Sequence, residues 1–77
     1  MNKMHLRELT DEYVEYEYYP EGEGVPGIVR MNFSDDYPII LKRAETPSVM
    51  HANHALSAVK KCVLNREFPD IFTNAWY

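Results

Sequence analysis

The chain has 77 residues and a formal net charge of −4, with 45% hydrophobic and 26% charged residues. This length and balance are typical of one small globular domain with a thin core, which we expect to span residues 1–77. A lone cysteine excludes an internal disulfide, and no apolar run approaches the roughly 20 residues that cross a bilayer. The N-terminus lacks the apolar stretch of a signal peptide, so we expect a cytoplasmic protein with no membrane partner.

The first predicted strand lies at residues 12–19. The preceding residues, 1–11, show no regular hydrophobic period, and we expect them to lead into this strand with at most a short turn of helix. Residues 12–19 are rich in aromatic residues and alternate, with Val14, Tyr16 and Tyr18 on one face. A period of two residues is typical of a half-buried strand.

Two more strands are predicted before the middle of the chain. Residues 20–27 are rich in glycine and proline and indicate a loop, which is followed by a strand at 28–33. A polar turn at 34–36 leads to a third strand at 37–44, where Pro38 favours an edge position. Strands joined in quick succession predict an antiparallel meander.

A helix is predicted at residues 49–66. Thr46 or Ser48 is expected to cap it, and Pro69 to stop the chain from continuing as helix. One stripe of the helical wheel is apolar and should face the sheet. This stripe consists of Ala52, Ala55, Leu56, Val59 and Val63.

The C-terminal tail, residues 69–77, is too apolar to be left in water. We expect Ile71, Phe72 and Trp76 to pack against the helix or the sheet, because a small domain needs the buried area.

These elements predict an α+β fold, a three-stranded antiparallel β-meander with one C-terminal amphipathic helix packed on one face. The predicted core combines the inward positions of the strands with the helix stripe and the tail. It consists of Val14, Tyr16, Tyr18, Val29, Met31, Phe33, Ile39, Leu41, Ala52, Leu56, Val59, Val63 and Trp76.

No catalytic residue, cofactor or metal site is predicted. His51 and His54 are three residues apart on the helix, but no Cys or acid stands at the spacing that would complete a zinc site, so we interpret them as surface polar residues. Cys62 lies near a helix C-terminus, where the dipole raises a thiol pKa, and we interpret it as a small hydrophobic residue at the core margin. Glu15 and Glu17 share a strand face, about 6.5–7 Å apart, but nothing suggests the burial that general acid chemistry requires.

The glycine loop at 22–27 lacks the Lys-Ser/Thr pair of a phosphate-binding loop and leads into a strand, so we interpret it as a connector.

The tyrosines indicate a partner surface. The chain has six tyrosines, and Tyr13 and Tyr19 fall on the face of the first strand that points away from the core. Tyrosine is favoured at interfaces because its ring can be buried while its hydroxyl stays wet. The uncovered sheet face is therefore the predicted interaction surface. It consists of Tyr13, Glu15, Glu17, Tyr19, Ile28, Arg30, Ile40 and Lys42.

Two stretches of the sequence carry distinctive motifs. Tyr-Tyr-Pro-Glu-Gly at 18–22 leads to a Gly-Ile-Val strand, and His-Ala-Leu at 54–56 precedes a C-terminal Asn-Ala-Trp-Tyr. Together they resemble a set of short bacterial proteins of unknown function, over much of the chain. The resemblance implies no activity, cofactor or site residue.

The sequence favours a non-enzymatic protein–protein interaction module, for which a homodimer through the uncovered sheet face is one arrangement. The alternative is an acidic mimic of nucleic acid that inhibits a nucleic-acid-binding protein, because Glu8 to Glu23 contains seven acids and no base. Direct binding of nucleic acid ranks lower, since phosphate contacts come from Lys and Arg. An enzyme ranks lowest.

Overall fold

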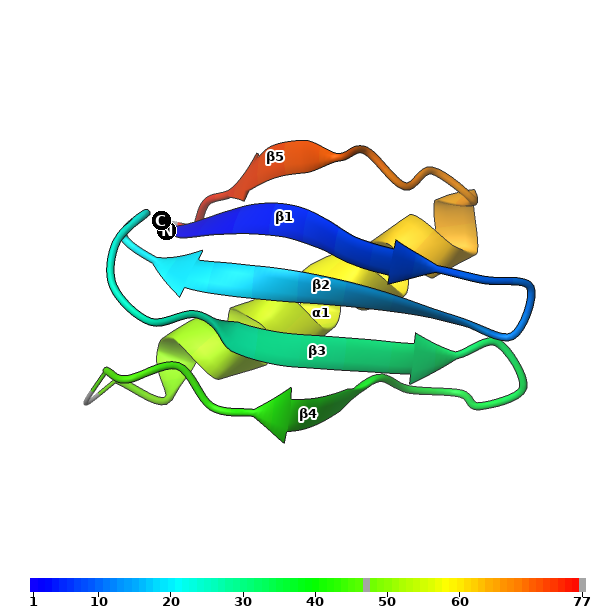
Figure 1. Cartoon of the computed structure of the whole chain (residues 1–77), viewed down its shortest axis with the longest axis horizontal. Coiled ribbons are helices and arrows are strands. Elements are labelled where there is room, and N and C mark those ends of the chain that lie inside the picture. Colours follow the sequence, from blue (N-terminus) through cyan, green and yellow to red (C-terminus); the bar gives the residue numbers. More distant parts are fainter. Residues whose placement is uncertain (47, 77) are drawn as a thin grey trace.

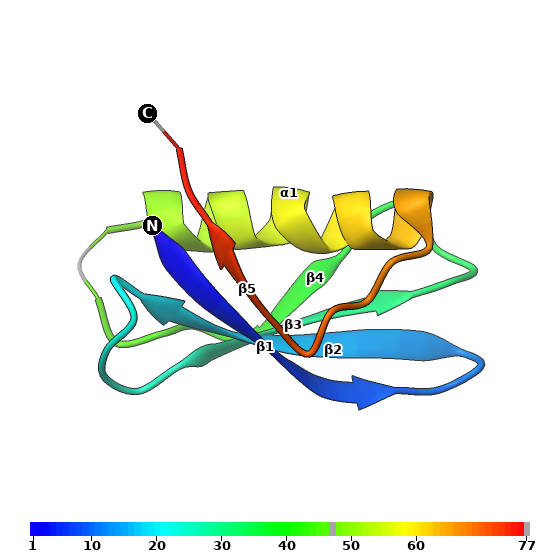
Figure 2. The same ribbon diagram turned by 90° about the horizontal axis from the view of Figure 1, so that it is seen from above.

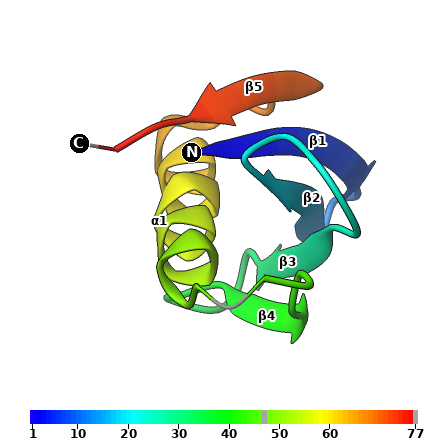
Figure 3. The same cartoon turned by 90° about the vertical axis from the view of Figure 1, so that its left-hand side faces the viewer.

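The computed structural model describes residues 1–46 and 48–76, in which five strands and one helix follow one another (Figure 1). In chain order they are β1 (Asn2–Leu9), β2 (Tyr13–Pro20), β3 (Gly27–Asn32), β4 (Ile39–Lys42), α1 (Met50–Asn65) and β5 (Ile71–Asn74). The strands form one sheet in the order β4-β3-β2-β1-β5, and all neighbours are antiparallel. Figures 2 and 3 show that α1 lies against one side of this sheet and leaves the other side uncovered.

The α+β class and the position of the helix are confirmed, but the prediction of three strands is wrong, because β1 and β5 also join the sheet. In β1, Met4 and Leu6 pack toward the core, but the register then shifts before Glu8, so that Leu9 lies opposite Val14. This bulge breaks the period of two residues that identifies a strand from sequence.

The tail folds back as predicted and does so as a strand. In β5, Phe72 lies opposite Met4 and its ring meets the ring of Tyr16 edge-on, with 5.5 Å between centroids. Beyond the strand, the ring of Trp76 stacks on that of His54 at 4.0 Å. Ile71 is the exception, because it lies on the uncovered side of the sheet and is 55% exposed.

The core lies between the sheet and α1 and is built around two tyrosines. Tyr16 and Tyr18 are almost fully buried, and their hydroxyl groups have partners: the Tyr16 hydroxyl donates to the Pro69 carbonyl at 2.7 Å, and the Ala44 N–H donates to the Tyr18 oxygen at 3.0 Å. The buried apolar residues are Met4, Val14, Tyr16, Tyr18, Val29, Met31, Ala44, Ala52, Ala55, Ala58, Val59 and Cys62. Leu56 and Val63 are partly buried and pack against this cluster, as the helix stripe predicts.

The predicted phase of the third strand is wrong. Ile40 lies opposite Val29 and packs toward the core, whereas Ile39 lies opposite Arg30 on the uncovered side. Ile39 and Leu41, both predicted in the core, are about half exposed at 51% and 49%. The cause is the uniformly apolar run of residues 39–41, which has no alternation to set the phase, together with a register shift between β3 and β4.

Both ends of the helix agree with the prediction to within one residue, but its cap differs. Val49 occupies the N-cap position without a capping side chain, although the Ser48 hydroxyl accepts a hydrogen bond from the Met50 N–H at 3.3 Å. At the other end Arg66 adopts a left-handed conformation with φ of 53°. Two more residues predicted in the core lie outside the buried cluster. Phe33 is 37% exposed and its ring centroid lies 6.1 Å from that of Phe68, and Trp76 packs on His51 and His54 of α1 instead.

Candidate functional site

The side of the sheet that α1 leaves uncovered, called the open face below, carries most of the predicted interaction surface. The strand registers place seven of the eight predicted residues there: Tyr13, Glu15, Glu17, Tyr19, Ile28, Arg30 and Lys42. The eighth, Ile40, belongs to the core side for the reason given above. The alternation of β2 and β3 was therefore interpreted correctly, and that of β4 was not.

Glu15 is the centre of an ion-pair network on the open face. Its side chain is only 6% exposed, and it lies between Arg7 of β1 and Arg30 of β3. Arg7 Nε is 3.1 Å from Glu15 Oε1, and Arg30 places Nε at 2.7 Å and Nη2 at 2.6 Å from Oε2. The hydrogen bonds with Glu15 raise the pKa of Arg30, which holds the guanidinium in its charged form. A buried carboxylate with charged partners on both oxygens fixes these three side chains in place.

Two half-buried tyrosines are held by the same network. The guanidinium of Arg30 lies 3.7 Å from the centroid of the Tyr13 ring, and the Tyr13 hydroxyl donates to Glu8 Oε1 at 2.6 Å. That hydrogen bond raises the pKa of Tyr13. Tyr19 donates from its hydroxyl to Glu17 at 3.3 Å, and its ring centroid lies 4.8 Å from that of His5. Neighbouring side chains of the same chain therefore hold both rings in place.

Sequence reasoning missed the contribution of β1 and β5 to the open face. His5, Arg7 and Glu8 of β1 contact the tyrosines and Glu15, and Ile71 of β5 lies opposite His5. Alternation at Met4 and Leu6 is the signal that was available, but it covers too few residues to identify a strand.

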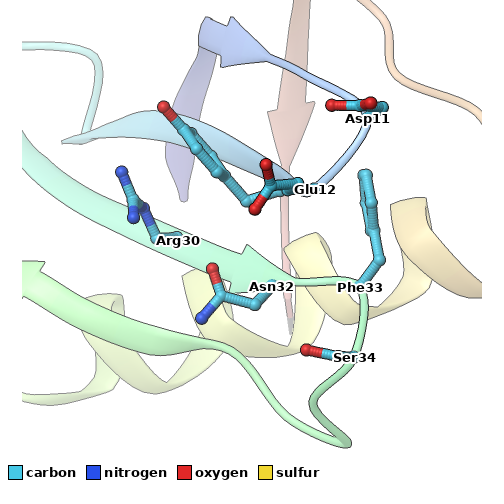
Figure 4. Close-up of a pocket in the computed structure, with 7 residues that line it drawn as sticks. Asp11, Glu12, Arg30, Asn32, Phe33 and Ser34 are labelled. Atoms are coloured by element: carbon cyan, nitrogen blue, oxygen red, sulfur yellow. The ribbon is translucent and has the colours of Figure 1, made fainter.

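A shallow hollow lies at the end of the open face, between the β1–β2 turn and the end of β3 (Figure 4). In Figure 4, Asp11 and Glu12 come from that turn, and Arg30 and Asn32 from β3. Arg30 already forms an ion pair with Glu15. Asp11 and Glu12 are exposed, an environment unlike that of the buried carboxylates that act as general acids.

His51 and His54 of α1 and the cysteine lie away from this face. His51 Nε2 is 3.1 Å from Glu21 Oε1, and the rings of His51 and His54 both contact Trp76, so they are less exposed than predicted. Within residues 1–46 and 48–76, no three His, Cys, Asp or Glu side chains form a group that could hold a metal ion. Cys62 is buried in the core, as predicted, and burial raises the pKa of its thiol.

Comparison with protein-family models, with curated proteins and with solved structures found no match to this chain. In the part of the chain that the structure describes, no helix has both the length and the apolar character needed to cross a membrane. A functional proposal must therefore come from the side chains described above.

Proposed function

We propose that this protein is a non-enzymatic protein–protein interaction module and that the open face binds its partner. The observation that carries the proposal is the ordered trio of Tyr13, Arg30 and Glu15 on β2 and β3 of the face. Tyrosine and arginine are over-represented among the residues that dominate binding energy at interfaces. Side chains already fixed by neighbours lose little conformational entropy on binding, which favours affinity.

Apolar side chains flank this polar centre. Ile39 on β4 and Ile71 on β5 lie at opposite edges of the face, and each is more than half exposed, at 51% and 55%. Between them Ile28 is half-buried opposite Glu17. A partner that covers the face would remove these groups from water while keeping the ion pairs intact.

The pairing of charges favours a protein over a nucleic acid. Arg7 and Arg30, the bases nearest the centre, are already bound to Glu15 and are not free for phosphate groups. Glu15, one of the seven acids that suggest an acidic nucleic-acid mimic, is buried and paired with two arginines rather than displayed. The partner is then another protein or a second copy of this chain.

The test is to recover the partner with affinity-tagged protein and to measure the loss caused by substitutions on the open face. Ile71→Glu and Tyr19→Ser alter the face at two places, and Leu64→Glu is the matched control, because Leu64 is 69% exposed on α1. We expect both open-face variants to lose the partner and the control to retain it, with all three folded by circular dichroism. Sedimentation of the pure protein separates a second copy from a different partner. Equal binding by all variants, or no partner together with a monomer at high micromolar concentration, would refute the proposal.

A further inference from the structure

The helix leaves one end of the sheet uncovered on its own side. Figure 2 shows that the β1–β2 and β3–β4 turns extend past the C-terminal end of α1. Leu9, the last residue of β1, lies opposite the core residue Val14 and so belongs to the α1 side of the sheet. Leu9 is nevertheless 47% exposed, because α1 ends short of it.

A hollow of about 300 Å³ lies at this end and is called the end hollow below. Its lining is mainly apolar and consists of Leu9, Thr10, Phe33, Val63, Arg66 and Phe68. Val63 and Phe68 pack against the core, whereas Leu9 and Phe33 are exposed to solvent. Apolar side chains gathered around one hollow are typical of a binding surface, whereas single exposed ones are not.

The segments that meet around the end hollow are acidic. They are the β1–β2 turn, the start of the β3–β4 connection and the residues that follow α1, all at one end of the domain in Figure 1. None of their acids takes part in an ion pair within residues 1–46 and 48–76. These acids are Asp11, Glu12, Asp35, Asp36 and Glu67, and all five are exposed.

The bases at the same end do not balance these acids. Arg66 lines the end hollow, and Lys60 of α1 donates from Nζ to the Asp36 carbonyl at 2.8 Å. Five acids against these two bases leave a formal charge of −3. The surroundings of the end hollow therefore attract positive charge.

Two of the acids are fixed beside the apolar lining. The Phe33 N–H donates to the Glu12 carbonyl at 2.9 Å, which ties the end of β3 to the β1–β2 turn. Figure 4 shows the Phe33 side chain directed toward the turn that carries Asp11 and Glu12. On the other side, Glu67 lies in sequence between two lining residues, Arg66 and Phe68.

We propose that the end hollow binds a segment of another protein in which an apolar side chain is flanked by lysine or arginine residues. The apolar side chain enters the hollow beside Leu9 and Phe33 and is removed from water there. The flanking bases lie against Asp11, Glu12 and Glu67. These charges select a basic partner and speed its approach.

The charge pattern favours a different protein over a second copy of this chain. The exposed Leu41 is followed by Lys42 and Arg43, and this apolar and basic run lies at the opposite end of the sheet. If it entered the end hollow of another copy, the contact would be head-to-tail and would continue into rings or fibres rather than close as a dimer. The end hollow lies on the α1 side, so this proposal does not rest on binding at the open face.

The test is a titration of the isotope-labelled protein with synthetic peptides, followed by amide NMR shifts. The probe is the capped peptide Lys-Lys-Leu-Phe-Lys-Lys. One control peptide has glutamate in place of every lysine, and the other has serine in place of Leu-Phe. We expect the probe to shift the amide signals of Thr10, Phe33 and Arg66, and both control peptides to shift them far less.

Charge reversal at the rim tests the role of the acids. Asp11→Lys combined with Glu12→Lys should raise the dissociation constant of the probe at least about tenfold. Glu23→Lys combined with Glu45→Lys makes the same change of charge at exposed positions of the other end and should leave the affinity within about twofold. Circular dichroism checks that both variants fold.

Several results would overturn this proposal. They are the absence of shifts with the probe, equal shifts with either control peptide, and shifts confined to the open face. A dimer of the pure protein that the Asp11 and Glu12 reversals dissociate would assign the end hollow to a second copy instead. Ile71→Glu and Tyr19→Ser should leave probe binding unchanged, so the open face and the end hollow can fail independently.

Discussion

The two faces of this sheet use the same kinds of residue for different purposes. On the side of α1, the hydroxyl groups of Tyr16 and Tyr18 bond to backbone groups, and the rings are buried in the core. On the open face, the hydroxyl groups of Tyr13 and Tyr19 bond to carboxylates, and the rings remain half-exposed. All four tyrosines come from β2. The face on which a side chain lies therefore decides whether it stabilises the fold or is available for binding.

The largest expected difference between the faces is between Tyr16 and Tyr13. Tyr16→Ala removes a fully buried ring and its hydrogen bond, and we expect it to lower the free energy of unfolding by about 4 kcal/mol. Tyr13→Ala removes a half-exposed ring, and its cost should be about 1 kcal/mol. Urea unfolding followed by circular dichroism measures both. Equal losses would mean that the open face belongs to the folding core.

The next effect tests how tightly the core side is packed. A methyl group at Gly27 would overlap the ring of Tyr18, whose oxygen accepts the Ala44 N–H. Gly27→Ala should therefore cost about 3 kcal/mol by displacing that ring. Glu23→Ala, at an exposed position in the loop before β3, is the control and should be neutral. If both variants unfold at the wild-type urea concentration, the Tyr18 contact is not as close as described.

Adjacent residues of β5 sharpen the comparison further. Phe72→Ala removes a ring that packs edge-on against Tyr16 and should cost about 2 kcal/mol, because the site is only partly buried. Ile71→Ala, one residue earlier on the open face, should cost about 0.5 kcal/mol. Thermal unfolding of the two variants shows which substitution causes the larger loss of stability. A larger loss for Ile71→Ala would indicate that β5 is turned over relative to the structure.

On the open face itself, the largest expected effect is at Glu15. Glu15→Ala leaves Arg7 and Arg30 without their carboxylate, but both arginines reach solvent, so we expect a loss of only about 1 to 2 kcal/mol. Glu17→Ala, at a more exposed carboxylate, is the control and should change the free energy of unfolding by less than about 0.5 kcal/mol. Urea unfolding at low and high salt measures the loss in free energy caused by Glu15→Ala, which should be only slightly smaller at high salt. An effect that salt abolishes would contradict the burial of that ion pair.

The last comparison is the response to alkali, which should be stronger on the core side, because the pKa of Tyr16 is raised further than those of Tyr13 and Tyr19 on the open face. Burial raises the pKa of the Tyr16 hydroxyl and of the Cys62 thiol, so both groups hold their protons more tightly in the folded state. Their contribution to stability is complete below the unfolded pKa values, about 9 for the thiol and about 10 for the phenol, and is lost as the pH rises above them. Tyr16→Phe and Cys62→Ala should each flatten the fall of the urea midpoint between about pH 8 and pH 11. An unchanged slope in both would contradict this assignment.

The strand faces could be predicted wherever apolar and polar residues alternate. β2 and β3 alternate cleanly, and their core residues and open-face residues were assigned correctly, with Tyr16 and Glu15 as examples. β4 is apolar at three successive positions, so the sequence has no signal for its phase, and Ile40 was placed on the wrong side. The local sequence pattern is sufficient to assign the faces of a strand only where apolar and polar residues alternate.

The remaining strands depend on contacts that are distant in sequence. β1 begins with Asn2, which is fully buried because its side-chain amide donates to the His51 carbonyl at 2.8 Å and to Asn74 Oδ1 at 3.2 Å. A buried asparagine at the start of a strand is not part of a hydrophobic pattern, so the pattern does not reveal that β1 begins there. The centre of the candidate site depends on a nearer contact, because Arg7 lies only eight residues before Glu15 and reaches it once β1 pairs with β2.

The position of β1 between β2 and β5 has a consequence for synthesis. Its ladder with β2 closes across a short turn, but its ladder with β5 joins Asn2 to Asn74 and must wait for nearly the whole chain. Until residues 71–74 leave the ribosome, one side of β1 is an unpaired edge that can capture a neighbouring nascent chain. The outer edge of β1 is therefore covered only when residues 71–74 have been made and have paired with it.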